Sequence, residues 1–466
     1  MTYADFIQQK SQTERNFGFK PIWMPDFLFD FQKKLVEWAT LKGRSATFAD
    51  CGLGKTPMQL VWCENVIRKT NKPTLIITPI AVGRQTLKEA EKFGIDAYRS
   101  WDGKLRGSPA IVITNYERLH YFNPQDFDGV ACDESSSLKN FDGATKDAIT
   151  EFMRTRPYRS LYTATAAPND YVELGTSSEC LGEMGYMDML IRFFKSTQNT
   201  YAQGGASGAG GRRFSHELFG GKFRFRGHAE QDFWRWVCSW ARAIRKPSDM
   251  GFDDGKFKLP KLITRQYIIK ANQTQEGYLF DLPAVGLKEQ RAERSRTIEE
   301  RCEKAAEIIN ARTDQSIAWC YLNREGDLLE KLIKNCVQVC GDDLEEKKEE
   351  AFAAFESGQI CNMVTKSTIA GFGMNWQFCH HQTHFPNHSF EQWYQAIRRS
   401  WRFGQTHDVE IDVITSEGES AVLKSIERKT AAAEKMFDQL VALMNNELKI
   451  KTMNKYTRKE KVPAWL

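Results

Sequence analysis

The fold is decided by the stretch Ala49-Asp50-Cys51-Gly52-Leu53-Gly54-Lys55-Thr56. A short apolar run at 46–48 precedes it and a helical pattern over 57–69 follows it, so the sequence predicts a strand, a glycine loop and a helix in succession. A loop that opens a helix in this way directs backbone N–H groups and the positive end of the helix dipole toward one point. The stretch therefore predicts a site for a phosphate group.

Four residues of this stretch have separate roles in the predicted site. Gly52 and Gly54 let the backbone turn its N–H groups toward a phosphate. Lys55 can neutralise the terminal phosphate oxygens of a nucleotide, and the Thr56 hydroxyl can bind Mg²⁺. The general phosphate-loop pattern begins with a glycine, and this chain has Ala49 at that position. The prediction therefore rests more on the strand–loop–helix context than on the match to the motif.

A metal-bound nucleotide also needs carboxylates, and the sequence offers a pair further along the chain. The apolar run at 129–132 ends in the adjacent acids Asp133 and Glu134. A strand that ends in two acids places Asp133 at the metal ion and Glu134 beside an attacking water. The pair alone is a weak signal, but together with the Lys55 loop it predicts a nucleotide hydrolase.

Two series of apolar runs separated by helical patterns indicate two α/β lobes. The first series extends over 41–180, and the second begins near Ser316 and continues to Ile414. Runs rich in Val, Ile and Thr that alternate with amphipathic stretches are typical of a mostly parallel sheet flanked by helices. We expect an N-terminal lobe, a helical insertion, a C-terminal lobe and a basic tail, at 1–195, 196–260, 261–445 and 446–466 respectively.

The predicted insertion combines a flexible part with a helix. The glycine-rich run 204–211 is too flexible to pack. After it, an apolar stripe at helical spacing predicts a helix that packs on a core, through Phe233, Trp236, Trp240 and Ile244.

The insertion also holds an excess of basic residues. Between Arg212 and Lys246 nine Lys or Arg residues accompany three acids, a net charge of +6, whereas the rest of the chain sums to −1. Such a basic island indicates a phosphate-rich partner, although a solvated surface would have the same composition. The candidate nucleic-acid contacts within it are Arg224, Arg226 and Arg235.

The composition excludes several other classes of protein. The 466 residues are 41% hydrophobic and 27% charged, which is typical of a soluble globular protein with two or three domains. No apolar run approaches the ~18 residues of a membrane span, and residues 1–10 lack a signal-peptide pattern, so we expect a cytoplasmic protein without membrane contact. Eleven cysteines without a CxxC pair indicate reduced thiols, and the Cys and His residues of 379–388 match no standard metal-ligand spacing.

These residues, in this order, resemble the superfamily-two helicase-like ATPases of the Swi/Snf type, over roughly 25–420. That family's nucleotide loop commonly reads ADxMGLGKT, and 133–140 (DESSSLKN) is similar to its DExx box. Segments 163–169 (TATAAPN) and 367–375 (STIAGFGMN) resemble two further motifs, the first with Ala164 in place of a glycine. The most specific match is 395–405 (QAIRRSWRFGQ), which is similar to QAxxRxxRxGQ.

The resemblance implies two tandem RecA-like P-loop lobes with ATP and Mg²⁺ bound between them. Gln32 lies in a segment similar to the one that reads adenine, and Gln395 is expected to contribute to nucleotide binding. Arg399 and Arg402 are three apart on a predicted helix and hence on one face, from which both are expected to reach the γ-phosphate.

The resemblance further implies a motor that hydrolyses ATP to translocate on or remodel DNA, duplex or branched, with little sequence preference. The segment Thr114-Asn115-Tyr116 resembles a first-lobe segment that lies along a nucleic-acid strand, and Thr114 and Asn115 are the candidate contacts. We expect a monomer, with replication or recombination proteins as further partners. The compact chain looks like a bacteriophage or prophage version, which would act in the host cytoplasm.

Three alternatives remain open at this stage. An RNA helicase of the same superfamily would share every catalytic residue. An ATP-dependent switch or recruitment subunit for DNA replication, recombination or restriction would hydrolyse ATP slowly, whether or not nucleic acid is present. A P-loop kinase of small molecules would leave the motif at 395–405 unexplained.

Overall fold

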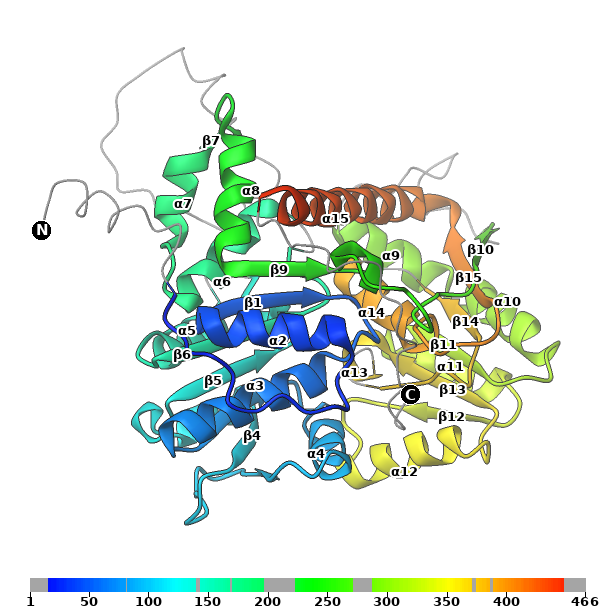
Figure 1. The fold of residues 1–466 in the computed structure, drawn as a ribbon. Helices are drawn as coiled ribbons and strands as arrows, with labels where there is room; N and C mark the ends of the chain where they lie inside the picture. The colour runs from blue at the N-terminus through cyan, green and yellow to red at the C-terminus, as the bar shows by residue number, and fades with distance from the viewer. Residues whose placement is uncertain are drawn as a thin grey trace, which may run out of the picture. The chain divides into compact units, whose positions relative to one another are not determined.

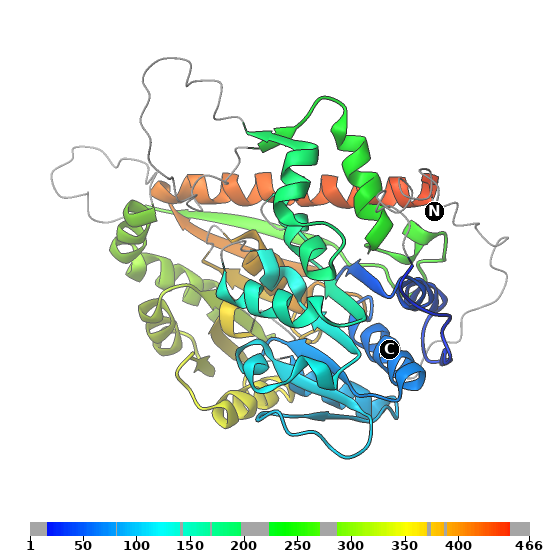
Figure 2. The ribbon, with the colours of Figure 1, turned by 90° about the vertical axis from the view of Figure 1, so that its left-hand side faces the viewer.

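The computed structural model describes residues 16–80, 82–139, 143–167, 170–196, 223–270, 287–370, 374–385 and 389–447. The chain divides into two compact units, the first formed by Met1–Asp254 with Ala432–Leu466 and the second by Gly255–Ala431. Each unit is built around its own parallel sheet (Figures 1 and 2). The run 204–211 and nearly all of the expected tail lie outside the described residues.

The sheet of the first unit has the strand order β3-β4-β2-β5-β6-β1-β9 within the described residues, and its strands are parallel. Its strands are β1 (Arg44–Ala49), β2 (Thr74–Thr78), β3 (Ala97–Arg99), β4 (Ile111–Asn115), β5 (Gly129–Asp133), β6 (Tyr158–Thr163) and β9 (Ala241–Ile244). Every residue of β2, β4 and β5 is buried, as expected for a parallel sheet covered on both faces. Because the strands are parallel, their C-terminal ends share one side of the sheet, here called the carboxyl edge.

The handedness of the connections distributes the helices over the two faces. The chain crosses the sheet in one direction from β1 to β2 to β3 and in the other from β4 to β5 to β6, so right-handed crossovers lie on opposite faces. The face nearer the viewer in Figure 1 carries α2 (Asp30–Lys42), α3 (Lys55–Thr70) and α4 (Gly83–Lys92). The other face carries α5 (Ala144–Arg154) and α6 (Leu174–Leu181).

Beyond β6 the chain forms two helices, with a pair of short antiparallel strands between them in the sequence. They are α7 (Tyr186–Phe193), β7 (Phe194–Ser196), the antiparallel β8 (Phe223–Phe225) and α8 (Ala229–Trp240). The predicted apolar stripe is confirmed for Phe233, Trp236 and Trp240, which are buried in the core of the first unit. It was wrong for Ile244, because α8 ends at Trp240 and the chain continues as β9, whose hydrogen bonds to β1 extend the sheet.

The sheet of the second unit has the order β10-β15-β14-β11-β13-β12 within the described residues, again with parallel strands. Its strands are β10 (Leu262–Ile269), β11 (Ser316–Cys320), β12 (Cys336–Val339), β13 (Asn362–Lys366), β14 (His381–His384) and β15 (Val409–Ser416). Side chains of β11 alternate between two cores: Ile317 and Trp319 belong to one, Ala318 and Cys320 to the other.

Helices cover both faces of this second sheet as well. They are α9 (Leu287–Arg296), α10 (Ile298–Asn310), α11 (Asn323–Leu332), α12 (Glu345–Glu356), α13 (Ser367–Ala370) and α14 (Phe390–Ser400). Ile298 and Leu329 of α10 and α11 belong to the core that holds Ala318, whereas Phe355 of α12 and Ala396 of α14 belong to the core that holds Ile317. The predicted architecture of two lobes, each a parallel sheet flanked by helices, is confirmed.

The long helix α15 (Ser420–Glu447) follows β15, and its residues from Ala432 onward belong to the first unit. There, Met436, Phe437 and Leu440 are buried in the same core as α8. Residues 432–445, which the sequence assigned to the C-terminal lobe, therefore pack with the first unit. Among the described residues, no helix is long and apolar enough to cross a membrane.

Candidate nucleotide site

The loop after β1 has the backbone conformation that its glycines make possible. Gly52 and Gly54 have φ angles of +86° and +76°, in the left-handed region that glycine adopts readily. A Cβ atom on Gly54 would lie 2.3 Å from Nε2 of Gln32. A side chain at Gly54 would therefore both strain the backbone and displace Gln32 from the loop.

Gln32 of α2 is completely buried, and both ends of its amide are used. Its Oε1 accepts a hydrogen bond from the backbone N–H of Phe29 at 2.9 Å, and its Nε2 donates to the carbonyl of Leu53 at 2.9 Å. Gln32 thus ties the start of α2 to the glycine loop. Its contact with adenine stays a prediction.

Lys55 and Thr56 open α3 directly after the loop. The Nζ atom of Lys55 donates to the carbonyl of Ala49 at 3.0 Å, so the ammonium group lies over the loop itself. Thr56 is half-buried in the first turn, where the N–H groups of a helix have no partner within it. The start of α3 therefore offers an ammonium group, a hydroxyl and backbone donors at the carboxyl edge.

Asp133 is the last residue of β5 and is buried at the same edge. Burial and the neighbouring carboxylate of Glu134 raise the pKa of Asp133 to about 7, and the charge of Lys55 opposes this increase. The two sequence-predicted groups, the Lys55 loop and the Asp133–Glu134 pair, are therefore close enough to interact electrostatically. A cation placed beside them would favour the charged form of Asp133.

Glu134 has a φ angle of +48°, an uncommon conformation for a residue with a side chain. Its Oε2 accepts a hydrogen bond from the hydroxyl of Thr163, at the end of β6, at 3.4 Å. The same hydroxyl accepts from the backbone N–H of Thr165 at 3.0 Å. Thr163 thus connects Glu134 to the segment 163–169, of which 168–169 lie outside the described residues.

The oxygen atoms of Thr56 and Asp133 are ligands of the kind that Mg²⁺ prefers, and Mg²⁺ usually completes its shell with phosphate oxygens and water. Within the described residues no group of three or more His, Cys, Asp or Glu side chains could hold a metal ion by itself. The donors present therefore fit a metal ion that binds together with a nucleotide.

The histidines that follow Cys379 are part of the core of the second unit. His381 is fully buried, with its Nδ1 2.8 Å from the hydroxyl of Ser316 and its Nε2 2.9 Å from Oδ2 of Asp412. His384 is also buried, and burial lowers its pKa to about 3. Both histidines therefore lie in the interior of the second unit.

Thr114 and Asn115 end β4 at the carboxyl edge, but both are buried, with exposed fractions of 4% and 5%. The Oδ1 atom of Asn115 accepts from the backbone N–H of Arg118 at 3.1 Å and so caps the 3₁₀ helix η1 (Tyr116–Tyr121). Contact of Thr114 and Asn115 with nucleic acid stays a prediction.

Tyr116 also belongs to the site, although the sequence placed it, with Thr114 and Asn115, only in the segment expected along a nucleic-acid strand. Its hydroxyl donates to the carbonyl of Asp133 and lies 3.3 Å from Sγ of Cys132. Burial raises the pKa of Tyr116 well above its usual value. The only signal in the sequence was its position directly after Thr114 and Asn115, which does not reveal that it lies beneath the two acids.

In the second unit, Arg399 and Arg402 meet at one carbonyl group, and Gln395 contacts Arg399. Arg399 donates to the carbonyl of Met374 at 2.8 Å and to Oε1 of Gln395 at 2.9 Å, and Arg402 donates to the same Met374 carbonyl at 3.5 Å. The expectation that one helix carries both arginines was wrong, because α14 ends at Ser400. The two guanidinium groups nevertheless converge.

The basic island is partly exposed and partly internal. Arg224, which is exposed, lies opposite Lys195, also exposed, in the antiparallel pair of strands β7 and β8. The exposed Arg226 donates through Nε to the carbonyl of Phe194 at 2.6 Å. Arg242, by contrast, is buried with its guanidinium 4.1 Å from the ring of Trp38, and burial lowers its pKa to about 10. Arg212, Arg213 and Lys222 lie outside the described residues.

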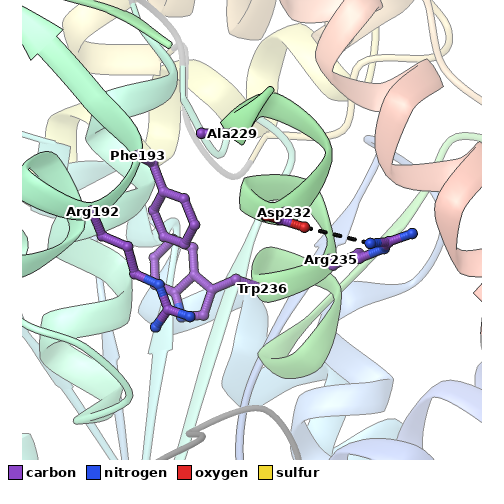
Figure 3. A pocket seen from close by; sticks show the side chains of 6 residues that line it. All are labelled: Arg192, Phe193, Ala229, Asp232, Arg235 and Trp236. Atoms are coloured by element: carbon purple, nitrogen blue, oxygen red, sulfur yellow. Dashed lines mark hydrogen bonds and ion pairs between the residues drawn. The ribbon is translucent and has the colours of Figure 1, made fainter. Parts of the chain in front are cut away.

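A cleft of about 340 Å³ lies between α7 and α8, lined by Arg192, Phe193, Ala229, Asp232, Arg235 and Trp236. Figure 3 shows Arg192, Phe193 and Trp236 grouped on one side and Arg235 directed toward Asp232 on the other. The Arg235 guanidinium is 3.4 Å from the Asp232 carboxylate, so part of its charge is already balanced.

Comparison with solved structures supports the assignment of fold. A variant of Dbp5 from S. cerevisiae, bound to RNA and ADP BeF3, is similar to this chain with a TM-score of 0.51 and 12% identity, over 89% of this chain and 98% of that chain. The SWI2/SNF2 ATPase core of Sulfolobus solfataricus in complex with dsDNA has a TM-score of 0.42 and 16% identity, over 94% of this chain and 100% of that chain. No protein-family model matches the sequence, and no curated protein matches it. At 12% identity the likeness to the Dbp5 variant concerns the fold alone, which is that of two RecA-like lobes in one chain.

Proposed function

We propose that this chain is an ATP hydrolase that acts as a motor on DNA. The observation that carries the proposal is the carboxyl edge of the first sheet, where the Lys55 loop interacts electrostatically with Asp133. In open α/β sheets, ligands bind at this end of the strands. An ammonium group, the start of a helix and two adjacent carboxylates together are suited to a metal-bound nucleoside triphosphate.

Each of these residues of the first unit has its own role in the proposed hydrolysis. Lys55 and the backbone of Gly52 and Gly54 hold the phosphates, and Thr56 and Asp133 would hold Mg²⁺, which neutralises phosphate charge when bound. Glu134, held by Thr163, orients the attacking water. Gln32 keeps the loop in the conformation that accepts phosphates.

The second unit is proposed to complete the site. Arg399 and Arg402, already converging on Met374, are suited to stabilising the charge that develops on the transferred phosphoryl group. Arginines in this role contribute about 10³ to 10⁵ in rate in related enzymes. We infer that hydrolysis requires the two units to close on the nucleotide, and that closure steps the chain along nucleic acid.

DNA is the proposed substrate, contacted through the exposed Arg224, Arg226 and Arg235 of the basic island. RNA is the second candidate, because the fold is also that of Dbp5, which was solved with RNA bound. Phosphate contacts by arginine would serve either polymer, so the substrate has to be determined by measurement. Action in a phage-infected host and partners from replication or recombination stay predictions.

The test is the steady-state ATPase rate titrated with single-stranded DNA, duplex DNA, branched DNA and RNA. We expect stimulation by duplex or branched DNA above that by RNA, and loss of turnover in Lys55→Ala and Glu134→Gln. Lys69→Ala, at the exposed far end of the same helix α3, is the matched control and should keep the rate. Wild-type turnover in Glu134→Gln contradicts the catalytic assignment, whereas slow turnover indifferent to every polymer favours the switch or recruitment role.

A further inference from the structure

Glu134 has an unfavourable backbone conformation directly after the end of β5. Its φ angle of +48° lies in the left-handed region, and such a conformation persists only where surrounding contacts hold it. The carbonyl of Glu134 accepts a hydrogen bond from the backbone N–H of Ser137 at 3.2 Å, and its carboxylate accepts from the hydroxyl of Thr163 at 3.4 Å. Neither of these two contacts holds the peptide group that joins Asp133 to Glu134.

The hydroxyl of Tyr116 holds that peptide group. On the side of β2, the pairing of β5 ends at Cys132, opposite Ile77. A buried carbonyl needs a donor, and the Tyr116 hydroxyl donates to the carbonyl of Asp133. The same hydroxyl lies 3.3 Å from the carbonyl of Glu134 and 3.3 Å from Sγ of Cys132. Because β4 is on the far side of β2, Tyr116 reaches past the end of β2 to the last peptide of β5.

Tyr116 is itself held in place by its backbone and by its ring. It is the first residue of η1, and Asn115 caps that helix by accepting a hydrogen bond from the backbone N–H of Arg118 at 3.1 Å. The ring of Tyr116 packs against the core of the first unit. A tyrosine side chain has only two rotatable bonds, so the hydroxyl is oriented before a nucleotide binds.

We propose that Tyr116 is a positioning residue for hydrolysis: its hydroxyl fixes the peptide between Asp133 and Glu134 and so directs both carboxylates. The N–H of the same peptide bonds the carboxylate of Asp133, so a rotation of the peptide plane would move the two acids together. The inference rests on the proposed function, because it concerns the carboxylates assigned there to Mg²⁺ and to the attacking water. Tyr116 acts through these acids and not on the nucleotide.

The first measurement is the ATPase rate of Tyr116→Phe, which removes one oxygen atom and keeps the ring. We expect kcat to fall by about 10-fold to 100-fold, because a misplacement of about 1 Å in an active site can cost about 100-fold. The KM for ATP should change by less than about threefold, because the contacts of the Lys55 loop with the phosphates are not altered.

A second measurement separates positioning from a general loss of structure. In the presence of Mg²⁺, affinity is measured for ADP with beryllium fluoride, which resembles the ground state, and for ADP with aluminium fluoride, which resembles the transition state. Tyr116→Phe should weaken the aluminium fluoride complex by about the factor lost in kcat and leave the beryllium fluoride complex nearly unchanged. Equal weakening of both complexes overturns the inference, because a merely structural role would affect both.

Hydrogen exchange of the chain without nucleotide tests the contact itself. In Tyr116→Phe the amides of residues 134–137 should exchange up to about tenfold faster, because one hydrogen bond is lost there, whereas the amides of β2 should not change. Asn115→Ala, which releases the start of η1 but keeps the hydroxyl, should act in the same direction by a smaller amount. It replaces Tyr116→Phe if circular dichroism shows that this variant fails to fold. Unchanged exchange at 134–137 in whichever variant folds overturns the inference.

The matched control is Tyr162→Phe. Tyr162 lies opposite Asp133 in the register of β5 and β6 and is buried, but within the described residues its hydroxyl bonds neither of the two carbonyls. This variant should keep the wild-type kcat and the wild-type preference between the two fluoride complexes. A wild-type chain that does not hydrolyse ATP contradicts the proposed function and the inference with it. Hydrolysis by the wild type together with an unchanged kcat in Tyr116→Phe overturns the inference alone.

Discussion

Arg245, in the turn after β9, and Asp438 of α15 form an ion pair although they are 193 positions apart in the chain. Around this pair, the hydroxyl of Tyr171 donates to the carbonyl of Ala432 at 3.5 Å, and Leu440 is buried against the core of the first unit. The last part of α15 is therefore a structural element of the first unit, even though the second unit precedes it in the sequence.

Leu440→Ala should lower the free energy of unfolding of the first unit by about 2–5 kcal/mol, because it leaves a cavity in a closed core. Urea denaturation measured through tryptophan fluorescence checks this. Asp438→Asn is the control: its ion pair is largely exposed, so the change should be below about 1 kcal/mol. Equal and small effects of both substitutions would show that α15 does not stabilise the first unit.

The raised pKa of Asp133 should make the free energy of unfolding depend on pH. Its pKa is raised from 3.8 to about 7 by burial and by Glu134, so the folded chain keeps a proton that the unfolded chain releases. The free energy of unfolding should therefore fall as pH rises from about 4 to about 7 and then level off.

Urea denaturation at pH 5 and pH 8 measures this effect as the difference between wild type and Asp133→Asn. The substitution should remove the decrease and so stabilise the chain relative to wild type at pH 8. Asp253→Asn, which changes an exposed acid of the same unit, should keep the wild-type pH dependence. A pH dependence that is the same in wild type and in Asp133→Asn contradicts the prediction.

Gln32 should affect nucleotide affinity through the loop. Gln32→Ala removes the bonds to Phe29 and Leu53 and should lower the free energy of unfolding by about 1–3 kcal/mol. It should also raise the KM for ATP more than it lowers kcat. Gln32→Glu keeps the acceptor for Phe29 but buries a carboxylate oxygen against the Leu53 carbonyl, so its loss of stability should be at least as large, and the same rise in KM in both variants assigns the effect to the loop. Wild-type KM in both variants would remove that role.

Arg399 should act on the rate of hydrolysis rather than on nucleotide binding. If the second unit supplies the arginines as proposed, Arg399→Lys should lower kcat by about 10³ or more and leave the affinity for ATP nearly unchanged. Lysine keeps the charge but cannot bond Met374 and Gln395 as the guanidinium does. Arg324→Gln, at an exposed position of α11, is the matched control. A kcat near wild type in Arg399→Lys would show that Arg399 does not stabilise the charge of the transition state.

The local sequence pattern was sufficient to predict the elements that hold the candidate nucleotide-binding residues. The glycine loop between β1 and α3, and the pair Asp133 and Glu134 at the end of β5, were predictable because strand, loop and helix signals lie within a few residues of one another. The alternation of strands and helices likewise determined the two parallel sheets. In contrast, the end of α14 before Arg402 was mispredicted, because a spacing of three does not reveal where a helix stops.

Only the tertiary structure could decide which distant segments meet. Nothing local in the sequence reveals that Tyr116 lies beneath Asp133, that β9 extends the first sheet, or that Leu440 completes the core of the first unit. Side-chain spacing defines a face of a helix or strand, but the partner of that face depends on contacts across many residues of chain. The sequence by itself therefore determined the groups that can hold a nucleotide, and the fold decided which distant residues support them.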